Sequence, residues 1–415
     1  MSSVEVRSDV IRLKSLRRLA GVALVVVSLF LATMALLINS PQLFFMGTAM
    51  VVTVLACRFQ AWLSVQGLRF ERTAPASVVA GDVATVEILV WSEQAVRRPL
   101  LIIVDNLPSR MVIVDRTSSL PVAPAPDFPV RSQYRFRPLK RGKYKWGGVT
   151  VEGTDALGLV TMRRAFETDS AEMTVLPRPI PVAFTVPNST GWGISEALSG
   201  QSRGAGIDTR GVREYASGDS IRHIHWPSTA RTNRLMVKEF EAGSHATVAF
   251  AIQRTWGTEA GSREFTSLET MCGHVAFMAQ EYLRMGAQVE FPTLEAPGSR
   301  SSPQLRLGEI YHMLAGIDAN GSLTLGDEIT RSMSGLAPGS VVFALIACVD
   351  ETILQAARSL RASNARIVAL LYDASAYYRR GLMPGSMRSA TDATFVSMLE
   401  QAGIESRIMP VQVNP

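Results

Sequence analysis

The sequence has few cysteines and little net charge, and both shortages exclude classes of protein. Its 415 residues contain three widely separated cysteines, Cys57, Cys272 and Cys348. Three isolated thiols cannot form a disulfide framework or a four-cysteine zinc site. Basic residues number 42 and acidic residues 36. The resulting charge of +6 is small for this length and does not indicate nucleic-acid binding.

The composition also excludes a mainly disordered chain, because apolar residues make up 47% of it and charged residues 19%. At about 100–200 residues per domain, the length predicts two or three domains. We predict a basic tail (1–18), a transmembrane helical hairpin (19–62), a β-sandwich (63–183), a charged segment (184–245) and an α/β domain (246–415).

Residues 19–57 contain no Asp, Glu, Lys or Arg. The first part, 19–38, has the length of a helix that crosses about 30 Å of hydrocarbon. A polar turn at 39–42 follows. The second apolar run, 43–57, is short, but it reaches spanning length if the helix continues past Arg58, whose long side chain can extend to the interface. The pattern predicts two membrane-spanning helices.

Flanking charges predict the orientation of this hairpin. Basic residues precede it at Arg7, Arg12, Lys14, Arg17 and Arg18 and follow it at Arg58, Arg69 and Arg72. The positive-inside bias therefore places both ends, and the bulk of the chain, on the cytoplasmic side of the inner or plasma membrane. Two alternatives are a cleaved signal peptide and a single span with the sandwich outside.

The middle of the chain lacks an amphipathic helix. Short alternating or β-branched runs separated by Pro and Gly predict strands at 83–91, 100–104, 111–114, 132–136, 143–151 and 172–176. Several short strands at this spacing suggest an immunoglobulin-like sandwich. No catalytic constellation accompanies them.

From residue 246 the pattern changes to strands that alternate with helices. The strands are predicted at 247–252, 288–291, 340–347, 366–372 and 405–411, and the helices at 264–284, 350–362 and 391–402. This alternation favours a doubly wound, mostly parallel sheet.

The segment between these domains is dense in arginine, acids, glycine and aromatics. Its ordered pattern comprises Gly204, Gly206, Asp208, Arg213, Tyr215, Gly218, Asp219, Arg222, Ile224, His225, Trp226, Ser228, Ala230, Arg231 and Val237-Lys238-Glu239-Phe240-Glu241. The segment resembles the signature of the domain-of-unknown-function 58 (DUF58) family of bacterial proteins. The motifs Arg141-Gly142-x-Tyr144 and Asp155-x-x-Gly158-Leu159 extend the resemblance over nearly the whole chain. Thr209 and Pro227 depart from the usual pattern.

The resemblance implies a C-terminal von Willebrand factor A-like domain and no established enzymatic activity or cofactor. Family members are often encoded beside MoxR-type AAA+ ATPases and transglutaminase-like membrane proteins. It therefore implies a non-enzymatic membrane-anchored adaptor or scaffold, with such proteins and the lipid bilayer as partners, in envelope or stress-related assembly. The alternative is a membrane-bound envelope hydrolase that uses the signature.

The individual side chains permit several chemical interpretations. A von Willebrand A domain often binds Mg²⁺ through Asp-x-Ser-x-Ser, but Gln253 occupies the Asp position here and the serines are absent. His223 and His225 are two positions apart and would share one face of a strand, as two zinc ligands might. A structural role is favoured for them. Gly204-x-Gly206 lacks the strand and helix of a nucleotide loop. A Ser228–His225–Asp219 triad would lack a nucleophile elbow.

Two roles stay open for the charged signature residues. Arg213, Arg222, Arg231 and Arg234 with Asp208 and Asp219 form a candidate ion-pair network, because arginine holds carboxylates bidentately. Alternatively, the segment is a partner-docking surface with Tyr215 and Trp226 as its aromatic anchors. Asp350 is predicted to cap a helix.

Overall fold

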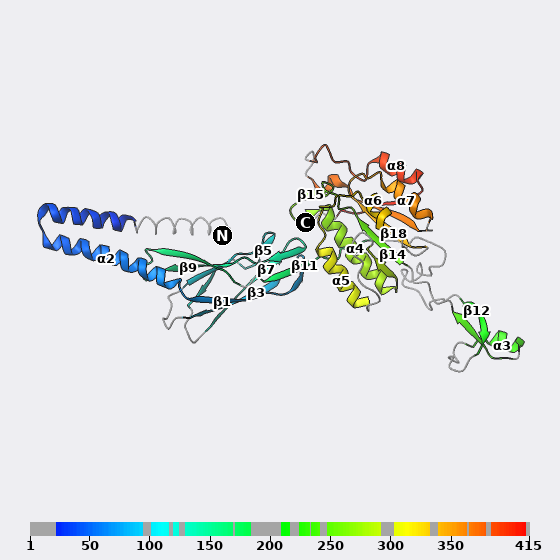
Figure 1. Ribbon diagram of the computed structural model, residues 1–415, viewed down its shortest axis with the longest axis horizontal. Helices are drawn as coiled ribbons and strands as arrows, with labels where there is room; N and C mark the ends of the chain where they lie inside the picture. Colours follow the sequence, from blue (N-terminus) through cyan, green and yellow to red (C-terminus); the bar gives the residue numbers. More distant parts are fainter. Residues whose placement is uncertain are drawn as a thin grey trace. The chain divides into compact units, whose positions relative to one another are not determined.

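The computed structural model describes residues 22–93, 101–115, 119–123, 129–168, 171–183, 209–215, 224–232, 234–240, 247–291, 303–332, 339–362, 365–378 and 383–411. The chain divides into two compact units, Met1–Leu176 and Pro177–Pro415. The first contains apolar helices and mostly antiparallel sheets, and the second contains a parallel sheet (Figure 1).

Two apolar helices open the first unit, Val22–Ile38 and α2 (Pro41–Ser64). They are joined at Asn39, whose φ of 54° lies in the left-handed region, so the turn expected there is present. The helices pack closely, since a Cβ on Gly47 would lie 3.4 Å from the Ala32 nitrogen.

Of the residues described, only α2 is long and apolar enough to cross a membrane, which suggests membrane association. The prediction of two spanning helices is not supported. The helix that ends at Ile38 is too short over its described part, and the start of the predicted 19–38 span lies outside the described residues. The second run instead continues past Arg58 to Ser64, as expected for a helix that reaches spanning length.

The rest of the first unit is β-structure. The strands are β1 (Leu68–Thr73), β2 (Ser77–Val79), β3 (Ala84–Ser92), β4 (Leu101–Asp105), β5 (Met111–Ile113), β6 (Ser119–Val122), β7 (Val130–Pro138), β8 (Gly142–Lys145), β9 (Val149–Thr154), β10 (Thr161–Phe166) and β11 (Glu172–Leu176). Two four-stranded antiparallel sheets, β1-β3-β7-β5 and β10-β9-β4-β6, share one core with a three-stranded sheet, β2-β11-β8.

The single strand predicted at 143–151 is two strands, because β8 pairs in the three-stranded sheet and β9 in a four-stranded one, with residues 146–148 between them. A Cβ on Gly148 would lie 2.3 Å from the Phe166 carbonyl oxygen, so the chain can pass here only as glycine. The immunoglobulin-like fold stays a prediction, since three sheets are present where that fold has two.

The second unit contains a small hairpin and an α/β body. The hairpin comprises β12 (Thr209–Glu214), α3 (Trp226–Thr232) and β13 (Met236–Phe240). The body comprises β14 (Thr247–Ile252), β15 (Gly261–Ser262), β16 (Phe265–Thr266), α4 (Ser267–Arg284), β17 (Gln288–Glu290), α5 (Pro303–Ala315), α6 (Leu325–Ser332), β18 (Val341–Ile346), α7 (Ile353–Ala362), β19 (Arg366–Leu371), the 3-10 turn η3 (Ala374–Tyr377), α8 (Ala393–Gln401) and β20 (Glu405–Ile408).

The main sheet has the order β17-β14-β18-β19-β20, and each neighbouring pair is parallel. After β14 the chain adds β17 on one side and then crosses to add β18 on the other. This reversal creates a switch point between β14 and β18, where open α/β sheets bind ligands at the carboxyl ends of their strands. The α/β sheet predicted from the alternation is present, while the von Willebrand A assignment stays a prediction.

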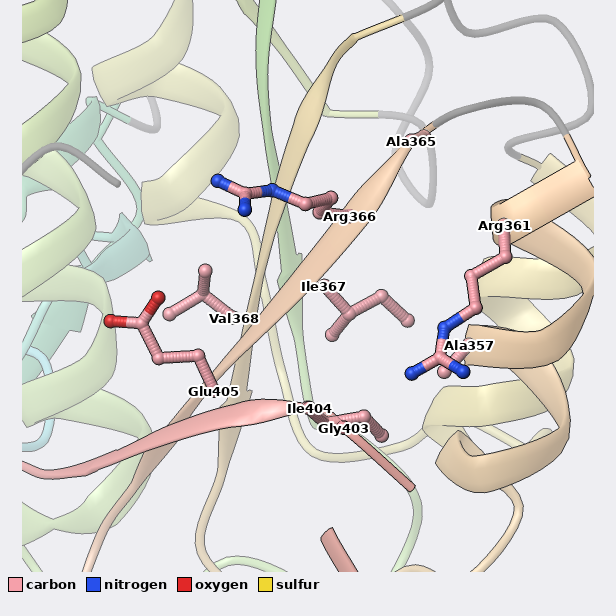
Figure 2. Close-up of a pocket in the computed structure, with 9 residues that line it drawn as sticks. All are labelled: Ala357, Arg361, Ala365, Arg366, Ile367, Val368, Gly403, Ile404 and Glu405. Carbon is pink, nitrogen blue, oxygen red and sulfur yellow. The ribbon is translucent and has the colours of Figure 1, made fainter. Parts of the chain in front are cut away.

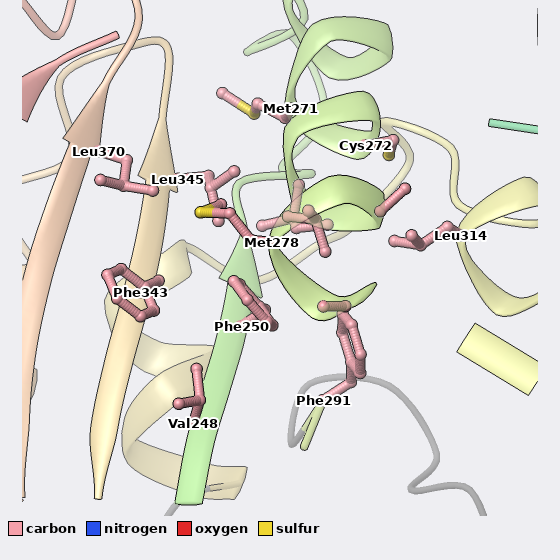
Figure 3. Close-up of a cluster of buried hydrophobic side chains, with 14 of the residues drawn as sticks. Val248, Phe250, Met271, Cys272, Met278, Phe291, Leu314, Phe343, Leu345 and Leu370 are labelled. Carbon is pink, nitrogen blue, oxygen red and sulfur yellow. The ribbon is translucent and has the colours of Figure 1, made fainter. Parts of the chain in front are cut away.

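Side-chain size separates the two faces of this sheet. Strand β14 directs Val248, Phe250 and Ile252 toward one face and Ala249 and Ala251 toward the other. The larger residues pack with α4 and α5, and the alanines pack with α6, α7 and α8. Figure 3 shows the face of the sheet that carries the larger side chains. There the Phe250 ring stacks against two other buried phenylalanine rings, with ring centroids 5.6 Å and 5.7 Å away.

Candidate functional site

The signature segment forms the hairpin of the second unit. Strands β12 and β13 pair antiparallel with a bulge between Thr209 and Gly211. The Tyr215 N–H donates to the Leu235 carbonyl at 2.8 Å, and the His225 N–H donates to the Met236 carbonyl at 2.8 Å. Tyr215 and His225 are therefore bonded to consecutive residues, the last one before β13 and the first one in it.

His225 lies at the start of α3 and bonds to its first turn. Its Nδ1 is 2.8 Å from the Ser228 hydroxyl oxygen and accepts the Ser228 backbone N–H at 3.3 Å. Helix starts carry free N–H groups, and the ring nitrogen satisfies one of them as a capping side chain would. The same contact also brings an imidazole within proton-transfer distance of a serine hydroxyl.

The structure places the other predicted signature residues only in part. Asp208, Gly218, Asp219, Arg222 and His223 lie outside the described residues. Arg213 lies in β12, and Lys238 and Glu239 lie in β13, where their backbones pair across the hairpin. The described side chains leave Trp226 63% exposed, with Tyr215 and Arg231 also exposed.

The described part of the hairpin contains one ion pair, and it is not among those expected. Arg234 Nη1 lies 2.6 Å from Glu214 Oε1, so the carboxylate comes from β12 itself. The hydrogen bond to Glu214 raises the pKa of Arg234. Both side chains are exposed, and exposed pairs contribute little to stability.

The switch point of the main sheet is filled by Gln253, which follows β14. Its side chain is buried and makes three hydrogen bonds across to the end of β18. Nε2 donates to the Cys348 carbonyl at 2.9 Å, and Oε1 accepts the N–H groups of Ala347 at 3.0 Å and Cys348 at 2.9 Å. A neutral amide can satisfy both donors and acceptors here, which a carboxylate cannot do.

Two acidic residues near this edge also stabilise the fold, one through backbone hydrogen bonds and one through an ion pair. Asp350 accepts the Leu325 N–H at 2.8 Å and the Thr352 N–H at 3.1 Å, so it caps the start of α6 and the turn before α7. Glu328 pairs with Arg254 at 3.1 Å, and burial raises its pKa. Among the described residues, no three His, Cys, Asp or Glu side chains converge as a metal site would require.

Beside the filled switch point lies an open hollow of about 450 Å³. Its lining includes Trp256, Thr258, Cys348, Glu351 and Arg388. Burial raises the pKa of the Cys348 thiol to about 11, which keeps it protonated and unreactive at neutral pH.

Trp256 is 82% exposed at this hollow, although the turn that carries it is held firmly. Its N–H donates to the Gly321 carbonyl at 2.9 Å, and the Gly321 N–H donates to the Arg254 carbonyl at 2.9 Å. The sequence patterns did not indicate a role for this residue. The available signal was an aromatic beside Gly257 in the loop directly after the first parallel strand.

A second hollow, of about 260 Å³, lies at the amino ends of β19 and β20 (Figure 2). Figure 2 shows Arg361 extending from α7 toward Gly403. Its Nη2 donates to the Ala402 carbonyl at the end of α8. This arginine therefore satisfies a helix terminus.

A family model described as "Protein of unknown function DUF58" matches residues 211–309. This match supports assignment to the DUF58 family. It begins inside the signature hairpin and extends through β14, Gln253 and α4. No curated protein matches the chain.

Two solved structures show weak likeness to the chain. A conjugative transposon lipoprotein from Bacteroides eggerthii is 13% identical, with 25% of this chain and 98% of that chain covered and a TM-score of 0.14. A GH20 exo-β-N-acetylglucosaminidase from Vibrio harveyi is 8% identical, with 74% of this chain and 57% of that chain covered and a TM-score of 0.17. At these scores neither likeness bears on fold or activity.

Proposed function

We propose that this protein is a non-enzymatic, membrane-anchored adaptor that docks protein partners. Helix α2 supplies the anchor, and the second unit supplies the docking surface at the carboxyl ends of its parallel strands. The flanking arginines favour a cytoplasmic location for this unit. The proposal includes a bilayer crossing by both N-terminal helices, an immunoglobulin-like first unit and a von Willebrand A-like second unit.

The exposure of Trp256 is the observation that carries this proposal. Tryptophan is enriched among the residues that dominate binding energy at protein interfaces. Here it is 82% exposed on a turn fixed by backbone hydrogen bonds. A rigid aromatic loses little conformational entropy when a partner covers it. Trp226 in the signature hairpin offers a second exposed anchor.

The filled switch point supports a protein partner over a small ligand. The crevice between β14 and β18 is where doubly wound sheets hold small molecules. In this chain the Gln253 amide occupies it and uses the backbone groups that a ligand would need. The accessible surface at this edge is therefore the open hollow beside Trp256.

We propose the class of partner from the family resemblance. We propose a MoxR-type AAA+ ATPase as the docked protein and a transglutaminase-like membrane protein as a further component of the assembly. Interleaved charges of both signs in the signature favour a protein partner over a nucleic acid.

The test uses full-length protein in lipid nanodiscs and the purified MoxR-type ATPase encoded nearest to it. We expect Trp256→Ala to weaken binding by about 30-fold or more, the cost of losing an interface hot spot. Val112→Ala, an exposed apolar residue on β5, is the matched control and should bind like wild type. Equal affinity for wild type and both Trp256→Ala and Trp226→Ala would contradict docking through these anchors.

One contact favours a second candidate, a membrane-bound envelope hydrolase. The 2.8 Å separation between His225 Nδ1 and Ser228 Oγ is compatible with a base and a nucleophile. The same nitrogen also accepts a backbone N–H, which weakens it as a base. A fluorophosphonate probe tests this function. Labelling of wild type that Ser228→Ala abolishes would favour the hydrolase, and absence of labelling would count against it.

A further inference from the structure

The end of α2 is attached firmly to the β-structure that follows it. Cys57, Ala61 and Ser64 form the buried side of the helix, which contacts β9 and β10. The contact is close at Gly153 in β9, where an added Cβ would meet the Ser64 hydroxyl at 2.1 Å. Helix and sheet therefore form a single rigid piece, and the position of the helix in a bilayer fixes the position of the sheet.

The turn between β9 and β10 is held beside the helix by a further hydrogen bond. The Ala156 N–H donates to Gln60 Oε1 at 3.1 Å. Within the turn, Asp155 accepts the N–H groups of Leu157 at 3.0 Å and Val160 at 2.7 Å. This turn holds Leu157 63% exposed, at the level where the turn is bonded to the helix.

The length of α2 sets the depth of this turn. About 20 helical residues cross the roughly 30 Å hydrocarbon core of a bilayer, and 20 residues from Pro41 end at Gln60. The turn is bonded to the helix at that level. Phe59 and Trp62 are exposed at the same level along the helix, with ring centroids 5.9 Å apart. Aromatic side chains concentrate at this depth, between hydrocarbon and headgroups.

We propose that the β9–β10 turn lies in the headgroup layer of the membrane and that Leu157 inserts among the lipids there. This inference rests on the proposed anchoring by α2. Leu157, Phe59 and Trp62 form its apolar contact, and the exposed Arg58 lies where its guanidinium reaches lipid phosphates. The motif Asp155-x-x-Gly158-Leu159 thereby acquires a role, as the rigid support for a lipid-contacting side chain.

The experiment measures lipid contact at single positions in the full-length chain. Leu157→Cys, carrying an environment-sensitive fluorophore, is reconstituted into phosphatidylglycerol–phosphatidylcholine vesicles with nitroxide-labelled lipids. The three native cysteines are buried, and the wild-type chain labelled in parallel measures any label that they take up. Val112→Cys on β5 is the control, since the extensive contacts of α2 are with β9 and β10 and not with β5. We expect nitroxides near the headgroups to remove most of the fluorescence at position 157 and little at position 112.

A third variant separates this inference from the anchoring on which it rests. Val52 is exposed near the middle of α2, so Val52→Cys reports insertion of the helix. Quenching at 52 by deep nitroxides together with quenching at 157 by shallow ones supports the proposal. Quenching at 52 with none at 157 overturns the lipid contact and leaves the anchor intact. Absence of quenching at 52 overturns both.

Discussion

The two units of this protein stabilise their most deeply buried polar groups in different ways. In the first unit both members of the Arg72–Asp105 ion pair are almost fully buried. The second unit keeps Arg254 of its Arg254–Glu328 pair partly exposed and uses a neutral amide and an uncharged imidazole at its most buried positions. This difference determines how much stability each unit should lose when one partner of a buried contact is removed. Removing one member of a buried charge pair leaves the other charge stranded, while removing a neutral partner leaves only unsatisfied hydrogen bonds.

The charged network joins the two four-stranded sheets of the first unit. Arg72 in β1 lies 2.5 Å from Asp105 at the end of β4, and both side chains are almost fully buried. Tyr134 in β7 donates to Asp105 at 2.6 Å, and the Trp146 indole N–H donates to the Tyr134 hydroxyl at 3.2 Å. Burial and the adjacent Asp105 charge raise the pKa of Tyr134, so the phenol stays protonated as a donor.

The neutral contacts of the second unit lie on and beside its parallel sheet. Gln253 connects the ends of β14 and β18. His274, within α4, places Nδ1 2.9 Å from the Tyr372 hydroxyl and is fully buried. Burial lowers the pKa of His274 to about 4, so the imidazole is neutral at physiological pH.

The largest expected effect comes from breaking the charged network. Asp105→Ala leaves Arg72 buried without its counter-charge and should reduce stability by about 3–5 kcal/mol. Thermal unfolding of the full-length protein in detergent measures the loss. The double variant Arg72→Met, Asp105→Leu should recover much of it, because an apolar pair carries no stranded charge. A double variant as unstable as Asp105→Ala would show that charge burial is not the cause.

The second largest expected effect is a loss of stability of the second unit at acidic pH. The unfolded chain protonates His274 near pH 6.5, while the folded state resists protonation until about pH 4. The unfolded state therefore binds more protons in this window, and stability falls as the pH drops through it, by about 3 kcal/mol in total. Hydrogen exchange in α4 peptides between pH 7 and pH 4 follows the change. His274→Gln should remove this part of the slope, and an unchanged slope would locate the titrating group elsewhere.

Loss of the neutral amide should cost less than loss of the ion pair. Gln253→Ala leaves the N–H groups of Ala347 and Cys348 without acceptors, for a cost of about 1–3 kcal/mol. Hydrogen exchange of the residues after β18 should accelerate, with the first unit unaffected. Gln253→Glu is the sharper variant, because it retains the acceptors and adds a buried charge. If it is as stable as wild type, the requirement for a neutral group is wrong.

The smallest expected effect on stability is at the proposed docking surface. Trp256 is mostly exposed, so Trp256→Ala should change the stability by less than about 0.5 kcal/mol. Thermal unfolding of the full-length protein in detergent, as for Asp105→Ala, measures this change in stability. A large loss of stability would mean that the tryptophan is structural, and the binding defect expected of this variant would then have no clear interpretation.

Local sequence patterns predicted much of the fold. The runs at 247–252 and 172–176 match β14 and β11, because β-branched and apolar residues there lie between turn residues. Helices α5 and α6 were not predicted. The continuation of α2 past Arg58 was anticipated because one long basic side chain can reach the interface.

The buried contacts could not be predicted from the sequence patterns. Arg72 and Asp105 are 33 residues apart in the sequence. Charged residues are mostly exposed, so the sequence alone favours a solvated position for each of them. The Gln253 position was recognised as lacking the acid of a metal site. Its pairing with Cys348 depends on a sheet order that brings residues 95 positions apart together.

Photo-crosslinking at Trp256 tests the central claim most directly. A benzophenone amino acid replaces Trp256 in the full-length protein in native membranes, and the same substitution at Val112 serves as the control. We expect an adduct between position 256 and the MoxR-type ATPase, identified by mass spectrometry, with none at position 112. Equal crosslinking at both positions, or adducts confined to the signature hairpin when Trp226 is replaced, would contradict docking at the carboxyl edge of the sheet.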